Sequence, residues 1–157
     1  MALLTADEII EIAMRLEESG AAFYNAAADR ADTEDLRVLF EELAIQEQYH
    51  CRVFRQMGSN VLELSLTPDQ WDQFLAYADA LLQQQFLSSP EKALNLAWQA
   101  RDEQGALQSA LGFERETLLF FQQLREVVRS PEQQTVDRII REEEQHIERL
   151  AGMLAGA

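Results

Sequence analysis

The chain has 157 residues, among them 28 acidic and 13 basic side chains, and its formal net charge is −15 at pH 7. This charge disfavours binding to nucleic-acid phosphates and to anionic membranes, and it favours cations as ligands. The length fits a single domain, which we expect to span residues 1–157. Because glycine and proline are scarce while Ala, Leu, Glu and Gln are abundant, the composition predicts an all-α fold.

The start of the chain and its single cysteine bear on where the protein works. The first residues contain no basic segment followed by an apolar run, so no signal peptide is predicted. No apolar stretch approaches the roughly 20 residues that a membrane-spanning helix requires. Cys51 is the only cysteine, which excludes an internal disulfide and a Cys-x-x-Cys metal site. We therefore expect a soluble, cytoplasmic protein without nucleic-acid or membrane partners.

Four long segments have apolar residues at every third or fourth position and are predicted to be helices. The first covers about residues 6–30, and the second runs from 33 to 58. The third covers about 102–129, and the fourth begins at Ser130 and Pro131. Because short links join the first to the second and the third to the fourth, each pair should form an antiparallel hairpin.

The connection between the hairpins, residues 59–101, is predicted to contain two further helices. One begins at Thr67 and Pro68 and extends to about Phe86, and a shorter one begins near residue 89. Two hairpins joined by a long crossover define the ferritin-like four-helix bundle, in which the second and third helices are parallel. The crossover also carries an apolar stripe that we expect to be buried on the bundle or in a homodimer: Phe74, Tyr77, Leu81 and Phe86.

Six ionisable residues interrupt the apolar stripes of the four main helices: Glu17, Glu47, His50, Glu114, Glu143 and His146. The second and fourth helices each contribute a Glu-x-x-His pair, whose three-residue spacing places both side chains on one helical face. The first and third helices each contribute one glutamate in line with apolar and small residues. All four glutamates and both histidines are therefore predicted to point into the bundle.

Such a cluster requires a cation, because four buried carboxylates repel one another and each costs several kcal/mol to bury unpaired. Carboxylate-bridged di-iron and dimanganese bundles use this arrangement: one glutamate from each of two helices and a Glu-x-x-His pair from each of the other two. Oxygen-rich ligands with imidazoles suit either metal and the spacing does not distinguish them, so two ions of iron or of manganese are predicted. The neighbouring acids are expected on solvated faces: Glu18, Glu42, Glu142 and Glu144.

The two hairpins repeat one another in sequence. The lone glutamate precedes the histidine of its own hairpin by 33 residues in the first half and by 32 in the second. An aromatic pair follows that glutamate at the same spacing in both halves, Phe23-Tyr24 and Phe120-Phe121. Tyr24 lies two helical turns after Glu17, where it could hydrogen-bond a ligand carboxylate or donate an electron. It is a candidate catalytic residue, and the alternative is an ordinary core tyrosine.

These motifs resemble the rubrerythrin family of ferritin-like proteins. Residues 16–24 (LEESGAAFY) and 39–50 (LFEELAIQEQYH) look like that family's first hairpin. Residues 113–121 (FERETLLFF) and 142–146 (EEEQH) look like its second hairpin. The resemblance thus extends over the four main helices and both Glu-x-x-His pairs.

The resemblance implies a ligand set and an activity. The six residues would be the ligands of two iron ions, with Glu47 and Glu143 bridging them; manganese is the alternative metal. The family reduces hydrogen peroxide or oxidises ferrous iron with peroxide or dioxygen, so we expect an oxidoreductase of the peroxidase or ferroxidase type. Typical members carry a four-cysteine rubredoxin domain that supplies electrons. Because this chain has Cys51 alone, the resemblance implies a separate electron-donor protein.

A second departure from the family is Thr117, which stands where typical members have a further glutamate that exchanges with a histidine as the irons change oxidation state. The redox-linked movement of iron is therefore not expected here. The sequence instead resembles a plain centre of four glutamates and two histidines.

Other function classes fit the same sequence. A ferritin-like storage subunit would use the centre as a ferroxidase and assemble into a shell, whereas the enzyme is expected to be a homodimer. A non-catalytic bundle would use the metals only to hold its core together. Manganese catalases and di-iron oxygenases share the ligand set, although an oxygenase would also need a pocket for an organic substrate.

Overall fold

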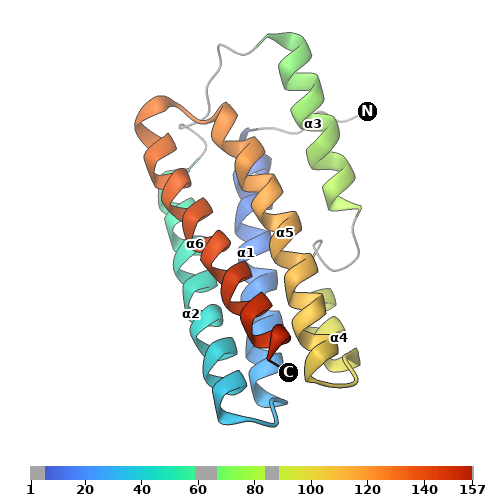
Figure 1. Cartoon of the computed structure of the whole chain (residues 1–157). Coiled ribbons are helices and arrows are strands. Elements are labelled where there is room, and N and C mark those ends of the chain that lie inside the picture. The colour runs from blue at the N-terminus through green and yellow to red at the C-terminus, as the bar shows by residue number, and fades with distance from the viewer. Residues whose placement is uncertain (1–5, 59–66, 84–88, 157) are drawn as a thin grey trace.

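The computed structural model describes residues 6–58, 67–83 and 89–156. Within these ranges the chain forms six α-helices (Figure 1): α1 Ala6–Asp29, α2 Glu34–Met57, α3 Pro68–Leu82, α4 Pro90–Gln99, α5 Glu103–Val127 and α6 Ser130–Ala155. The all-α prediction and its four long helices are confirmed. None of the helices in these ranges has an apolar stretch that could cross a membrane.

Local sequence signals define the ends of the long helices. The Thr33 side chain caps α2 by accepting a hydrogen bond from a main-chain amide of its first turn. Gly58 ends that helix with a φ of 68°, a left-handed value that glycine adopts readily. Asp102 caps α5 by accepting a hydrogen bond from the Gly105 amide at 2.7 Å. Pro131 lies in the first turn of α6, where the missing N–H breaks no helical hydrogen bond.

The long helices form two antiparallel hairpins, α1 with α2 and α5 with α6, which pack side by side (Figure 1). The connection returns the chain to the end of the bundle at which α2 began, so α5 runs parallel to α2. This is the ferritin-like arrangement predicted from the lengths of the links. Helix α4 lies along α1, where the small side chains of Ala93 and Ala97 are buried and allow a close approach.

Helix α3 begins as predicted but ends earlier. Thr67 and Gln70 form a reciprocal capping box at its start. The predicted extension to about Phe86 is wrong, because the helix ends at Leu82 and the Gln83 amide bonds back to the last turn. Phe86 itself lies outside the described residues.

The apolar stripe of α3 packs against the bundle. Burial on the bundle is one of the two predicted alternatives, and burial in a homodimer is the other. Phe74 and Leu81 are buried there with α1, α5 and α6 residues. The ring centroids of Phe74 and Tyr77 lie 6.2 and 6.4 Å from that of Phe120 on α5. This burial explains why the connection is more apolar than a solvated link would be.

Two apolar clusters fill the bundle, one toward each end. The first includes Phe54 of α2, Phe121 of α5 and Ile139 of α6, together with the α3 stripe. The second includes Phe40 of α2 and Leu107 of α5, together with residues of α4. The polar residues that interrupt the helical stripes lie between these two clusters, so the core consists of a buried polar layer with an apolar layer on either side.

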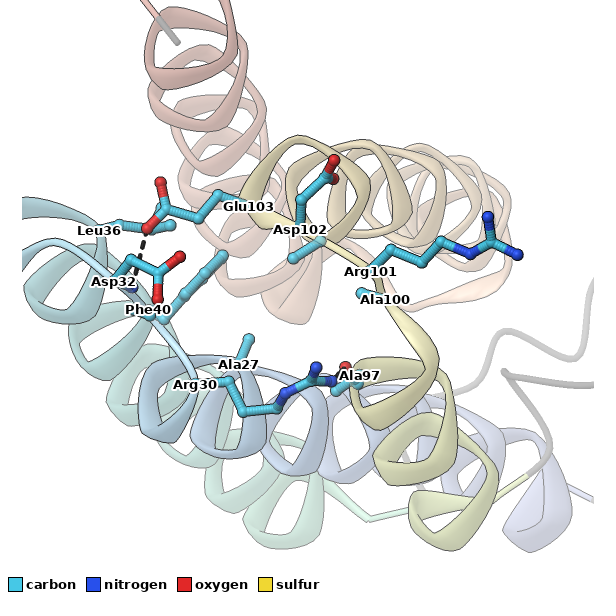
Figure 2. A pocket seen from close by; sticks show the side chains of 12 residues that line it. Ala27, Arg30, Asp32, Leu36, Phe40, Ala97, Ala100, Arg101, Asp102 and Glu103 are labelled. Atoms are coloured by element: carbon cyan, nitrogen blue, oxygen red, sulfur yellow. Dashed lines mark hydrogen bonds between the residues drawn. The ribbon is translucent and has the colours of Figure 1, made fainter.

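Residues of the α1–α2 turn contact the end of α4 and the start of α5 at one end of the bundle (Figure 2). The Arg30 guanidinium donates hydrogen bonds of 2.8 and 2.5 Å to two main-chain carbonyls at the end of α4. The Asp32 amide donates to the Glu103 carboxylate at 2.9 Å. These three residues line a cavity of about 140 Å³ that also has Phe40 in its wall. The contacts hold α4 and the start of α5 against the first hairpin.

Candidate metal centre

The six ionisable residues predicted to face inward lie together in the polar layer. They come from all four long helices: Glu17 from α1, Glu47 and His50 from α2, Glu114 from α5, and Glu143 and His146 from α6. Five of them are completely buried and the sixth is 1% exposed. Because the apolar clusters keep water away, charges here can be stabilised only by one another or by a bound ion.

Both histidines direct Nδ1 toward the carboxylates. His50 Nδ1 lies 3.0 Å from Glu143 Oε1 and 3.5 Å from Glu17 Oε1. His146 Nδ1 lies 3.0 Å from the other oxygen of Glu143, and two further glutamates approach it at 3.1 and 3.4 Å. The imidazole rings are nearly parallel, with centroids 5.9 Å apart. Glu143 therefore lies between the histidines with one oxygen toward each.

The ligand atoms form two overlapping groups, and within each group they lie within 4.8 Å of one another. We call the first group the Glu17 position; it consists of Glu17, Glu47, His50 and Glu143. We call the second group the Glu114 position; it consists of Glu47, Glu114, Glu143 and His146. Glu47 and Glu143 belong to both groups, as carboxylates that bridge two ions must. Each position offers three carboxylates and one imidazole.

Unpaired atoms test whether these residues fit a metal. Seven side-chain atoms of the six cluster residues have no hydrogen-bond partner among the described residues: Glu17 Oε1 and Oε2, Glu47 Oε1 and Oε2, Glu114 Oε2, Glu143 Oε2 and His146 Nδ1. A buried polar atom left in this state costs about 1–3 kcal/mol. The atoms approach one another without hydrogen-bond geometry, as ligands directed at a common centre do. Carboxylate and imidazole donors suit iron and manganese, so the residues fit a dinuclear centre.

Burial and mutual repulsion control the protonation of the glutamates in the metal-free cluster. Burial raises the pKa of Glu17 and of Glu47 well above the usual value, and the charge of Glu143 raises both further. The same two causes raise the pKa of Glu114 to about 7. Burial also opposes ionisation of Glu143, but its close contacts with the imidazoles of His146 and His50 outweigh burial and hold its pKa well below the usual value.

The histidines respond in the opposite sense. Burial would lower the pKa of His50, but its hydrogen bond with Glu143 and that residue's charge raise the pKa to about 9. Burial likewise opposes protonation of His146, and the carboxylates of Glu114 and Glu143, at 3.4 and 3.0 Å from Nδ1, raise its pKa to about 12. The metal-free cluster thus holds protons at the atoms that would bind a metal, so metal binding must displace protons.

Tyr24 contacts the cluster directly. Its hydroxyl donates a 2.5 Å hydrogen bond to Glu114 Oε1, so Tyr24 contacts a candidate ligand carboxylate, as one of the predicted roles required. Burial and the charge of Glu114 raise the pKa of Tyr24 well above its usual value, so the hydroxyl keeps its proton. The ring stacks on Phe40 at 5.9 Å, and Phe40 in turn lines the cavity at the bundle end (Figure 2). Two aromatic rings therefore separate that cavity from the polar layer.

Gly20 allows a carboxylate of α2 to lie close to α1. A Cβ atom at this position would be 3.0 Å from the Phe113 ring and 3.2 Å from Glu47 Oε2. Both distances are shorter than ordinary van der Waals contacts, so a larger residue would displace the glutamate or the ring. The periodicity of the sequence identified Gly20 only as a small residue in the α1 stripe.

Two residues outside the predicted set contact the outer nitrogens of the histidines. Glu142 Oε2 on α6 lies 2.5 Å from His50 Nε2 on α2. Gln46 Oε1 on α2 contacts His146 Nε2 on α6. The expectation that Glu142 is solvated is therefore wrong, because its side chain is only 31% exposed and crosses to the other hairpin. The sequence offers one indication of this role for Gln46 and Glu142, because each directly precedes the glutamate of a Glu-x-x-His pair.

Two other residues singled out in the sequence lie beside the cluster but in neither group. Thr117 is fully buried one turn after Glu114, and its hydroxyl has no hydrogen-bond partner among the described residues. Cys51 is buried, and its sulfur lies 3.7 Å from the exposed Glu18. Burial raises the pKa of the Cys51 thiol, and the charge of Glu18 raises it further. Cys51 is therefore a neutral core thiol.

Comparisons with known proteins agree with this fold. The family model described as rubrerythrin matches residues 8–154. A solved structure from Thermotoga maritima, described as a ferritin-like diiron-carboxylate protein, is similar with a TM-score of 0.67 and 23% sequence identity. The match covers 99% of this chain and 97% of that chain. No curated protein matches the sequence.

Proposed function

The chain belongs to the rubrerythrin family, and we propose that it is a non-haem di-iron protein that reduces hydrogen peroxide with electrons from a separate donor protein. The observation that carries the proposal is the pair of overlapping ligand groups, buried in the bundle and sharing Glu47 and Glu143. A purely structural polar layer would have its atoms hydrogen-bonded, whereas this layer leaves most carboxylate oxygens without partners.

The six residues would divide the work of holding two iron ions. One ion would take the Glu17 position and the other the Glu114 position, with each histidine binding through Nδ1. Glu47 and Glu143 belong to both groups, so both ions would share them. The four carboxylates would neutralise two divalent cations, and the loaded centre would then carry no net charge into the apolar interior.

The chemistry that iron supplies when bound is two-electron reduction of the peroxide O–O bond, one electron from each ferrous ion. The overall reaction consumes one hydrogen peroxide, two electrons and two protons and yields two waters. The apolar clusters exclude bulk water from the centre, and Tyr24 holds Glu114 in place through its hydroxyl. Cys51 is the single cysteine of the sequence, too few for a four-cysteine iron site, so the two electrons would come from a separate donor protein.

The proposal is tested on protein purified and loaded with ferrous iron without oxygen. We expect about two irons per chain by metal analysis, an optical spectrum that changes on adding peroxide, and peroxide consumption sustained by a chemical reductant. The double variant Glu47→Ala/His50→Ala should lose both the iron and the activity. Glu144→Ala is the matched control, because Glu144 is an exposed glutamate next to Glu143 and should be dispensable.

Several results would overturn the proposal. Iron retained by the double variant would show that the metal binds elsewhere. Peroxide consumption no faster than that of free iron would leave a metal-stabilised bundle. Rapid ferrous oxidation by dioxygen, together with a mineral-filled shell on size-exclusion chromatography, would identify a storage protein. If manganese alone restored the activity, the metal of the centre would be manganese and not iron.

A further inference from the structure

The two metal positions have different outer hydrogen bonds, although their ligands are the same in kind. At the Glu17 position, His50 Nε2 faces the carboxylate of Glu142 at 2.5 Å. At the Glu114 position, His146 Nε2 faces the amide oxygen of Gln46. With Nδ1 directed at a metal, Nε2 carries the ring proton and donates it to these oxygens. One imidazole therefore donates to an anion and the other to a neutral group.

The lone glutamates differ in a second, independent way. Glu114 Oε1 accepts a hydrogen bond from Tyr24, whereas neither oxygen of Glu17 has a hydrogen-bond partner among the described residues. The sequence repeat shows why: Tyr24 follows Glu17 by seven residues, and the residue that follows Glu114 by seven is Phe121. Phe121 is fully buried but has no hydroxyl to offer. The second half thus lacks the donor that the first half supplies.

Both differences affect metal binding in the same sense. A carboxylate that accepts the outer N–H of an imidazole makes the inner nitrogen a stronger electron donor, and loss of such a partner typically costs 10–100-fold in metal affinity. A hydrogen bond donated to a ligand oxygen has the opposite effect, because it draws electron density away from the metal. Glu142 therefore strengthens the Glu17 position, and Tyr24 weakens the Glu114 position.

We propose that the two positions are unequal and that the Glu17 position fills first with a divalent metal. Glu142 accepts the outer N–H of His50, and within the described part of the chain no hydroxyl donates a hydrogen bond to Glu17. The inference rests on the proposed function only in requiring that both positions bind metal. Glu142 and Gln46 are positioning residues, which act on the metal through the histidines. They would set the order of loading without touching either ion.

Co²⁺ is a suitable probe, because its d–d absorption reports binding without redox chemistry. We expect two separate binding steps in the metal-free protein, differing about tenfold or more in dissociation constant. Glu17→Gln should remove the tight step and leave the weak one, whereas Glu114→Gln should do the reverse. Anomalous diffraction from crystals grown with one equivalent of Co²⁺ should place the ion at the Glu17 position.

Substituting the outer partners tests their role more directly. Glu142→Gln keeps a hydrogen-bond acceptor but removes its charge, and should weaken the tight step about tenfold with little change in the weak step. Gln46→Glu should strengthen the weak step by a similar factor. The double variant Gln46→Glu/Glu142→Gln should bring the two steps together or reverse their order. Glu144→Gln, an exposed neighbour on the same helix, is the control and should change neither step.

The possible results separate the two proposals. No Co²⁺ binding by the wild-type protein would overturn both. Two equal steps, or first occupancy of the Glu114 position, would overturn the loading order and leave the di-iron proposal intact. Circular dichroism identifies any variant that is unfolded. If Glu142→Gln is unfolded, the Gln46→Glu variant decides alone, because an unchanged dissociation constant of its weak step also contradicts the inference.

Discussion

The first hairpin, α1 with α2, and the second, α5 with α6, place their ligands at matching positions but surround them differently. Three residues after the lone glutamate, the first hairpin has Gly20 and the second has Thr117. Seven residues after it, the first has Tyr24 and the second has Phe121. The ligands repeat, whereas the residues three and seven positions after the lone glutamate do not. The metal-binding geometry therefore comes from the repeated residues, and any difference between the positions comes from the unrepeated ones.

Removing a shared glutamate should have the largest effect, because it serves both hairpins. Glu143→Ala should reduce bound iron from about two per chain to almost none, since both positions lose a ligand and a charge. Glu17→Ala should retain about one iron, because the Glu114 position does not include Glu17. Metal analysis after gel filtration measures both. Equal losses in the two variants would mean that Glu143 is not shared.

The metal-free protein should become less stable as the pH rises. Protonated Glu114 contributes stability that is full below its ordinary pKa of 4.5 and is lost as the pH rises through about 7. Charged His50 contributes stability that is full below 6.5 and is lost as the pH rises through about 9. Both changes have the same sign, so the melting temperature of the metal-free protein should fall between about pH 5 and 9.

Thermal unfolding followed by circular dichroism across this pH range checks the prediction. The metal-loaded protein should show a much flatter profile, because bound metal replaces the protons and keeps the carboxylates ionised. Glu114→Gln should remove the part of the slope that lies between about pH 5 and 7. A melting temperature of the metal-free protein that rises over this range would contradict the charge assignment.

Substitution by alanine should lower the unfolding free energy at Gly20 of the first hairpin and raise it at Gly112 of the second. Gly20→Ala places a methyl group 3.2 Å from Glu47 Oε2, and should lower the unfolding free energy by about 1–3 kcal/mol and weaken metal binding. Gly112→Ala on α5 meets no atom within 4 Å and should stabilise the helix by about 0.5–1 kcal/mol. Urea unfolding of both variants measures the difference, and an equal gain in both would show that Gly20 has room to spare.

Tyr24→Phe should have a small effect, since it only makes the first hairpin resemble the second. Glu114 Oε1 would lose its donor, which should lower the stability of the metal-free protein by about 1–2 kcal/mol, or a few degrees in melting temperature. Differential scanning calorimetry can resolve a change of this size. Phe40→Leu, which alters the ring stacked on Tyr24 but leaves the hydroxyl, separates packing from hydrogen bonding.

The parts of this structure that follow from sequence are those encoded within one helix. Caps such as Thr33 and Asp102 and the three-residue spacing of Glu-x-x-His are local, so the long helices and the inward-facing ligands could be predicted. The role of Glu142 could not be predicted. Helical periodicity gives the face of the helix on which a residue lies, but not whether its side chain contacts a residue of a neighbouring helix. The constraint on Gly20 likewise depends on a carboxylate from a different helix.

The internal repeat has a consequence for how such a centre can diversify. Each hairpin supplies only one lone glutamate and one Glu-x-x-His pair, so two copies of a single hairpin related by a twofold axis would already complete both positions. In such a symmetric pair, every substitution would alter both positions at once. Joining the hairpins in one chain removes that restriction. Tyr24 opposite Phe121 and Gln46 opposite Glu142 are differences that a symmetric pair of identical hairpins cannot have.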